Sequence, residues 1–267
     1  MLEVKQILKQ ASYGATKPLF IIASDNKQYI LKFRNSSDYE EEKDLHIFNE
    51  YLGYELIKLL DYGIAPQKLE LIKIDETTLE LAKKACKNEY ISYEALNYLE
   101  KSFGTNIAVE YLENTEKANE NEINIFKFKN ETMHIDNFIL NNDRNTYNTN
   151  ILKDLNYKNK FYVIDFGLAF LDNRIYESIS NNNLSSYYMC LNTCNALTEK
   201  RYIFSYNEIQ FTKSKINNIR LEIEKIVNSC PSDWAMNKYK KDIIEILCNR
   251  IDSKLIFENS SCPMELY

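Results

Sequence analysis

Three side chains in the middle of the sequence have the types and the spacing that phosphoryl transfer from ATP requires. Asn148 follows Asp143 by five residues, and Asp165 ends the apolar run before Phe166 and Gly167. This chemistry needs a carboxylate that orients or deprotonates the accepting hydroxyl, together with oxygen ligands for Mg²⁺. An Asp-x4-Asn loop is weak evidence in an Asn-rich stretch, but the following strand that ends in Asp-Phe-Gly makes the combination specific.

A second asparagine in the same loop, Asn150, competes with Asn148 as a metal ligand. Spacing favours Asn148, because five residues is the separation at which such loops bring an amide to the second magnesium ion. Asn150 precedes Ile151 and Leu152, where the chain enters a strand. We therefore predict Asn148 as the ligand and a role in loop stability for Asn150.

A lysine and a glutamate in the N-terminal third are the expected partners of this loop. Lys32 lies in the β-rich run 28–33, and Glu50 follows on a segment of helical periodicity, residues 38–60. We predict that they pair, as a strand lysine and a helix glutamate do in phosphoryl transfer enzymes. Two simpler interpretations are that Lys32 is an exposed strand residue and that another acid of the helix is its partner, namely Glu40, Glu41, Glu42 or Glu55.

Two further segments are expected to contact the nucleotide. The loop 12–17, between the first two predicted strands, would cover the phosphates through hydroxyl and backbone N–H groups. It contains one glycine, so an ordinary hairpin loop is the alternative. Residues 109–112 would form the hinge that meets adenine, because of their order in the chain. The predicted contact residues are Ser12, Gly14, Thr16, Lys17, Glu110 and Leu112.

The periodicity changes along the chain from strands to helices. Alternating and apolar runs predict strands near the N-terminus, whereas most of the chain after residue 112 has helical spacing. Residues 113–124 are polar and are expected to be exposed. The predicted strands are 3–10, 19–23, 28–33, 69–74, 106–112 and 160–164, and the predicted helices are 38–60, 89–102, 214–228 and 236–251.

Composition restricts the classes of function. The 267 residues are 45% hydrophobic, enough for a sizeable core, and the net charge of −6 does not indicate a nucleic-acid partner. Neither a signal peptide nor a membrane-spanning apolar stretch is visible, so no membrane association is expected. The six cysteines are scattered without a CxxC pair, which favours reduced thiols and a cytoplasmic location.

The chain resembles the HipA-like kinases, bacterial serine/threonine kinases known from toxin–antitoxin systems, especially their short branch, which lacks an extra N-terminal subdomain. Asn145 stands where the long members have a histidine. The matching stretches are Gly14-Ala15-Thr16-Lys17-Pro18, Tyr29-Ile30-Leu31-Lys32, Asn49-Glu50, Asn141 to Leu152, Ile164 to Gly167, and the tail Cys230-Pro231-Ser232-Asp233-Trp234.

With the order of the elements, this resemblance implies an α+β, two-lobed protein-kinase-like fold. Residues 1–112 would form a β-rich N-terminal lobe with one helix, and residues 113–267 a mainly helical C-terminal lobe. The resemblance further implies ATP and Mg²⁺ as cofactors. Asp143 would be the catalytic base, Asn148 and Asp165 the Mg²⁺ ligands, and Lys32 the phosphate-binding lysine.

The predicted function is ATP-dependent phosphate transfer to a Ser or Thr hydroxyl of a protein, with autophosphorylation and a toxin–antitoxin-type role as further implications. An antitoxin or another regulatory partner is part of that expectation. One alternative is a small-molecule kinase of the aminoglycoside or choline type. It is disfavoured by Asn141, which stands where those enzymes have a histidine. Another is a nucleotide-binding pseudokinase or interaction module, against which the intact set of Lys32, Asp143, Asn148 and Asp165 argues.

Overall fold

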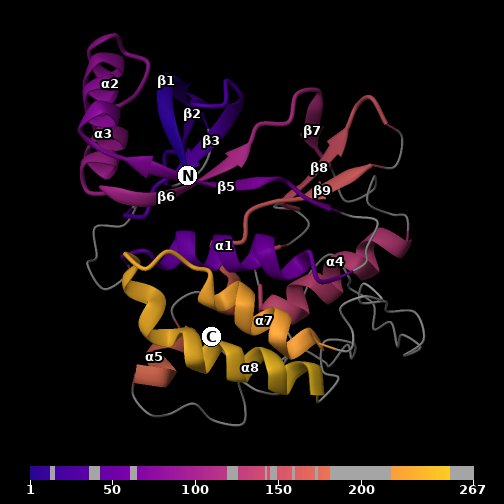
Figure 1. Ribbon diagram of the computed structural model, residues 1–267. Coiled ribbons are helices and arrows are strands. Elements are labelled where there is room, and N and C mark those ends of the chain that lie inside the picture. The colour runs from indigo at the N-terminus through magenta and orange to yellow at the C-terminus, as the bar shows by residue number, and fades with distance from the viewer. Residues whose placement is uncertain are drawn as a thin grey trace.

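Five strands close into a barrel at the N-terminal end of the chain (Figure 1). Their order is β1-β2-β3-β6-β5, with a parallel β1–β5 pair and antiparallel pairs elsewhere. In β3, Tyr29 and Leu31 fill the interior while Ile30 and Lys32 face outward, since successive strand residues alternate between faces. The bounds are β1 (Leu2–Gln10), β2 (Leu19–Ala23), β3 (Gln28–Lys32), β5 (Leu69–Ile74) and β6 (Gly104–Glu110).

The computed structural model describes most of the chain. The described residues are 1–12, 16–35, 43–60, 65–118, 126–141, 143–144, 149–157, 160–171, 174–180 and 218–252.

A second sheet of four short strands lies beside the barrel, in the order β4-β9-β8-β7. Its central hairpin, β8–β9, is antiparallel and pairs Ile151 with Val163. Asn150 therefore precedes one strand of the hairpin and Asp165 follows the other, so the sheet brings both to one end. The bounds are β4 (Ala65–Pro66), β7 (Thr115–Lys117), β8 (Ile151–Asp154) and β9 (Phe161–Val163).

Helix α1 (Leu45–Ile57) runs beneath both sheets and above α7 and α8 in Figure 1. Almost all of its side chains are buried, as in a helix surrounded by protein. Its apolar residues share one core with strands β8 and β9 and with the C-terminal helices. Those elements are α4 (Phe126–Ile139), the 3₁₀ turn η2 (Ala169–Leu171), α5 (Arg174–Ser180), α7 (Ile219–Asn228), the 3₁₀ turn η5 (Ala235–Tyr239) and α8 (Lys240–Asp252).

A second core fills the barrel and extends to the helices α2 (Glu76–Lys87) and α3 (Tyr93–Glu100), which pack on one side of it (Figure 1). Each helix begins at a side chain that caps its first turn. The carboxylate of Asp75 accepts a hydrogen bond from the Thr78 N–H, and the hydroxyl of Ser92 accepts one from the Ala95 N–H. Among the described residues, no helix combines the length and the apolar character that crossing a membrane requires.

The observed elements correct several predictions. The expectation of one helix in residues 1–112 is wrong, since the described residues of this part form three. The helices predicted at 38–60 and 89–102 correspond to α1 and α3, and α2 was not predicted. The helix predicted at 38–60 begins at Leu45, and residues 36–42 lie outside the described residues. The polar segment 113–124 contains the short strand β7, which pairs with β8. The helix predicted at 236–251 begins as the 3₁₀ turn η5 before α8.

A buried guanidinium joins the barrel to α1. Arg34 donates to both carboxylate oxygens of Asp44, at 2.6 and 3.0 Å, and Asp44 stands immediately before α1. The same guanidinium donates to the Asp233 carboxylate at 2.8 Å. Gly104 makes room for this junction, because its φ is 105° and a Cβ there would lie 2.6 Å from both Arg34 Nη1 and Asp233 Oδ2. The junction fixes the start of α1 relative to the end of β3.

We expect Asp44→Ala to lower stability by roughly 3 kcal/mol, because it removes one partner of a buried ion pair and places alanine at a φ of 68°, which alanine adopts only with strain. The midpoint of thermal unfolding should fall by roughly 10 °C for a domain of this size. The matched control is Glu55→Ala in the same helix, which removes only the partly exposed pair with Lys58 and should change the midpoint by about 1 °C or less. An Asp44→Ala midpoint within about 2 °C of the wild-type value would contradict the role of the junction.

Candidate active site

The side chain of Lys32 lies between two carboxylates that come from distant parts of the chain. Its Nζ atom is 2.6 Å from Glu50 Oε1 and 3.0 Å from Asp165 Oδ1. Strand β3 presents the lysine, α1 presents the glutamate, and Asp165 follows β9. The structure thus brings together three of the predicted site residues, whose roles remain predictions.

The two carboxylates differ in their environments. Glu50 is buried and burial raises its pKa to about 7, against the opposing effect of Lys32. The side chain of Asp165 is half exposed, and the Lys32 ammonium lowers the pKa of that carboxyl. Burial disfavours the charged form of Lys32, but Asp165 and Glu50 outweigh it and raise the lysine pKa. Lys32 is therefore charged at neutral pH. Of its two partners, Asp165 is the stronger acid and Glu50 the weaker one.

The Asp-Phe-Gly segment is held by α1. Asp165 has a φ of 62°, a left-handed conformation that is unfavourable for a residue with a Cβ. Glu50 Oε2 accepts a hydrogen bond from the Phe166 N–H at 2.8 Å. The Asn49 amide donates to the carbonyls of Gly167 and Ala169 at 3.1 and 2.8 Å. These bonds keep the unfavourable backbone conformation in place.

The ring of Phe166 packs closely on α1. A Cβ at Gly53 would lie 2.5 Å from the Phe166 Cβ, so the helix needs glycine at this point. The Tyr54 ring meets the Phe166 ring edge-on, with centroids 5.0 Å apart. Asn49 belongs to the matching stretch Asn49-Glu50, whereas Gly53 and Tyr54 were not among the predicted residues, although both lie close to Glu50 in the sequence.

The predicted base, Asp143, is partly buried in the loop after α4. The side-chain amide of Asn150 donates to its Oδ2 atom at 2.9 Å. The carbonyl of Asn150 accepts a hydrogen bond from the Ile164 N–H at 3.0 Å, which links the loop to the residue before Asp165. Asn148 and its neighbours 145–147 lie outside the described residues.

A magnesium site is compatible with the groups that are described. Within the described ranges, no three His, Cys, Asp or Glu side chains gather closely enough to hold a metal ion by themselves. Mg²⁺ in phosphoryl transfer enzymes is bound by one or two carboxylates together with phosphates and water, so it needs no such cage. The half-exposed, ionised carboxylate of Asp165 supplies a ligand of that kind.

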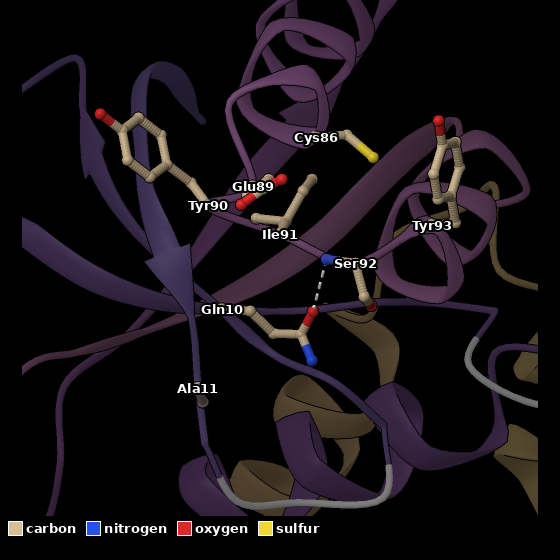
Figure 2. Close-up of a pocket in the computed structure, with 8 residues that line it drawn as sticks. All are labelled: Gln10, Ala11, Cys86, Glu89, Tyr90, Ile91, Ser92 and Tyr93. Atoms are coloured by element: carbon tan, nitrogen blue, oxygen red, sulfur yellow. Dashed lines mark hydrogen bonds between the residues drawn. The ribbon is translucent and has the colours of Figure 1, made fainter.

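The predicted phosphate loop is described only at its two ends. Ser12 is exposed and Thr16 is partly buried, while Gly14 lies outside the described residues. The ammonium of Lys17 lies 3.6 Å from Glu94 Oε2 on α3, so this pair connects the loop to the helix. Figure 2 shows a second connection, in which the Ser92 N–H donates to the side chain of Gln10 at 2.9 Å.

Part of the backbone of the predicted hinge is engaged within the fold. The Glu110 N–H donates to the Lys68 carbonyl at 2.8 Å, and the Gln67 amide donates to the Glu110 carbonyl at 3.2 Å. The Leu112 carbonyl accepts from the Thr115 hydroxyl at 2.9 Å. Sequence order alone could not show which backbone groups these bonds would occupy.

An apolar surface that sequence analysis did not single out lies between Lys32 and the hinge. Phe20 on β2 pairs with Ile30 on β3, so both share the outward face that carries Lys32. The Phe20 ring meets the Tyr111 ring edge-on, with centroids 5.4 Å apart. Such a surface suits a flat apolar group such as a nucleotide base.

A hollow of about 480 Å³ lies elsewhere, between the end of β1 and the connection of α2 to α3 (Figure 2). It contains none of the residues predicted to carry the chemistry, so we do not assign it as the active site. The residues around it are Gln10, Ala11, Cys86, Glu89, Tyr90, Ile91, Ser92 and Tyr93.

Comparisons with known proteins identify the fold and the family of the chain. The solved structure of the Helicobacter pylori proinflammatory kinase CtkA superimposes with a TM-score of 0.52 and 13% identity, over 93% of this chain and 91% of that chain. At this identity the likeness shows a shared fold. No curated protein matches the sequence. The model of the HipA-like kinases matches residues 4–261, nearly the whole sequence, and the chain therefore belongs to the HipA-like kinase family.

Proposed function

We propose that the protein is an ATP-dependent kinase that uses Mg²⁺ and transfers phosphate to a Ser or Thr hydroxyl of a protein. One observation carries the proposal: a single ammonium, that of Lys32, lies against both the buried Glu50 and the half-exposed Asp165. Phosphoryl transfer enzymes of the protein-kinase type need such a lysine–glutamate pair, together with an aspartate beside it that binds Mg²⁺, in order to bind and activate the nucleotide.

Each predicted residue has a distinct task in this proposal. Lys32, oriented by Glu50, binds phosphate oxygens of ATP. Asp165 and Asn148 hold Mg²⁺, which supplies positive charge next to the phosphates when bound. Asp143 accepts a hydrogen bond or the proton from the attacking hydroxyl. The amide of Asn150 keeps the carboxylate of Asp143 in a fixed orientation.

The nucleotide would lie along the outward face of the barrel. Phe20 and Ile30 offer an apolar surface to adenine, and Ser12, Gly14, Thr16 and Lys17 would cover the phosphates. We assign the polar contact with adenine to the backbone of Leu112 rather than to Glu110. The reason is that the N–H and the carbonyl of Glu110 are bonded within the fold. Because the carbonyl of Leu112 is bonded as well, the group assigned to adenine is the Leu112 N–H.

Autophosphorylation and a toxin–antitoxin-type role with a regulatory partner belong to the proposal through the family. We also propose a cytoplasmic location, which is compatible with the free thiols of Cys86, Cys230 and Cys248. Transfer of radiolabelled γ-phosphate to the protein itself and to proteins of a cell lysate tests the function. Transfer to aminoglycosides or choline alone would favour a small-molecule kinase, and nucleotide binding without turnover would favour a pseudokinase.

We expect Asp143→Ala and Asp165→Ala each to lower phosphate transfer at least ~100-fold, a typical loss for one essential catalytic group. Asp143→Ala should leave Mg·ATP affinity nearly unchanged, whereas Asp165→Ala should weaken it by removing a metal ligand. Glu116→Ala, at a carboxylate that is half exposed on β7, is the control. Near-normal transfer by either variant with normal thermal unfolding would overturn the assignment.

We expect Lys32→Met to lower kcat/KM on the order of 100-fold, because it removes the cation that binds the phosphates. Glu50→Gln should have the same kind of effect but a smaller one. Transfer by the wild-type protein at saturating Mg·ATP should also decline as the pH falls through about 7, since Glu50 then becomes protonated and no longer pairs with Lys32. Glu50→Gln should lack this decline. A Lys32→Met protein that transfers phosphate at the wild-type rate would contradict the proposal.

A magnesium titration distinguishes the roles of the two loop asparagines, Asn148 and Asn150. We expect Asn148→Ala to raise the Mg²⁺ concentration needed for half-maximal transfer about tenfold or more, the usual cost of losing a ligand group. Asn150→Gly should leave that concentration unchanged and lower the maximal rate. Glycine is chosen because Asn150 has a φ of 46°, which alanine adopts only with strain. Equal shifts in the two titrations would mean that both amides bind the metal.

A further inference from the structure

Helix α4 ends in a way that ties the loop carrying Asp143 to one buried carboxylate. Leu140 has a φ of 54° and turns the chain out of the helix, although a residue with a Cβ makes this turn at a cost. The Asn141 N–H then donates to the carbonyl of Asp136 at 2.8 Å, and the Leu140 N–H to that of Asn137. This is a Schellman ending formed without glycine. It leaves Asn141 beside the side chain of Asp136.

The carboxylate of Asp136 is fully buried and binds the loop at two points. Its Oδ1 atom accepts from the Asn141 amide at 3.0 Å, and its Oδ2 atom accepts from Arg144 Nε at 2.9 Å. Burial raises the pKa of Asp136, and Arg144 opposes that effect. Apolar side chains would fill such a site at least as stably. The charged side chain of Asp136 therefore points to a need for one specific conformation of the loop that it binds.

Arg144 connects the carboxylate of Asp136 to the far end of the loop. Its Nη1 atom donates to the carbonyls of Thr149 and Asn150 at 2.8 and 2.6 Å. Its guanidinium also lies over the ring of Phe166, at 5.8 Å from the centroid. A planar, forked cation is needed to reach the carboxylate and both carbonyls at once. The backbone of Asn150 is thereby fixed, and its amide meets Asp143 at 2.9 Å.

We infer that Asp136 is a positioning residue for phosphate transfer, acting through Arg144 and Asn150 to orient the carboxylate of Asp143. The inference rests on the proposed function, because it assigns Asp143 the role of the base. The side chains of Asp136, Arg144 and Asn150 make no contact that the Lys32–Glu50 pair requires, because β3 and α1 hold that pair. Loss of the orientation should therefore lower turnover more than nucleotide affinity.

The first test is Asp136→Asn, a nearly isosteric change whose amide cannot accept from both Asn141 and Arg144. Turnover should fall 30-fold or more, while the Kd for Mg·ATP stays within threefold of the wild-type value. Leu99→Ala, a cavity variant of α3 in the separate core of the barrel, is the control for general loss of stability. It should lower the unfolding midpoint and leave turnover per folded molecule within twofold.

The decisive comparison is the double variant Asp136→Asn with Asn150→Gly. Residues that act along one path give non-additive effects, so the double variant should be no more than about threefold slower than the slower single variant. Turnover of Asp136→Asn within twofold of wild type, or multiplication of the two single losses, would overturn the inference. If Asp136→Asn fails to fold, Arg144→Lys and its double with Asn150→Gly carry the same comparison, with the same expected and contrary results.

Hydrogen exchange separates this inference from the proposed function. The Ile164 N–H, bonded to the Asn150 carbonyl, should exchange at least tenfold faster in Asp136→Asn and at nearly the wild-type rate in Leu99→Ala. If the wild-type protein transfers no phosphate, the proposed function fails and the catalytic part of the inference fails with it. Unchanged exchange at Ile164 in Asp136→Asn overturns the positioning itself, whether or not the protein is a kinase.

Discussion

The arrangement of the candidate active site depends on the buried guanidinium of Arg34. It stands two residues after Lys32 in the sequence and binds Asp44 at the start of α1, so the lysine strand and the glutamate helix share one anchor. Arg34 also binds the carboxylate and the carbonyl of Asp233, so the segment before α8 is attached to the same guanidinium. Three segments of the chain meet at a cation that lysine could not replace, because only a planar, forked group satisfies several acceptors at fixed angles.

The electrostatics of the site follow from that shared anchor. Glu50 is carried into the core, where burial raises its pKa to about 7, whereas Asp165 stays half exposed and Lys32 lowers its pKa. One ammonium between two such carboxylates leaves Asp165 ionised and facing solvent, as a cation ligand must be. The left-handed backbone at Asp165 is tolerated because Asn49 and Glu50 bind the residues that follow it.

Sequence patterns predicted the barrel strands, α3, α7 and the residues of the Lys32 cluster, because apolar alternation and motif spacing are local signals. They missed α2 although its sequence has helical periodicity, with Leu79, Ala82 and Cys86 on the face that packs against the barrel core. They missed β7 because its residues are polar and stay partly or fully exposed, so only pairing with β8 defines it. The supporting groups Asn49 and Asp136 bind mainly loop and backbone atoms, and sequence spacing carries no sign of such partners.

The geometry that matters most for phosphate transfer, between Asp143 and Asp165, is set by the packing of two helices. Asp143 is tied to the end of α4 through the network around Asp136, and Asp165 is tied to α1 through Glu50. Both helices contribute to one apolar core, in which Phe138 of α4, Leu52 of α1 and Phe166 are fully buried. Close-packed cores transmit small displacements rather than absorb them. Any change that shifts α1 against α4 must therefore move Asp143, the predicted base, relative to Asp165, the predicted metal ligand, even where it touches neither carboxylate.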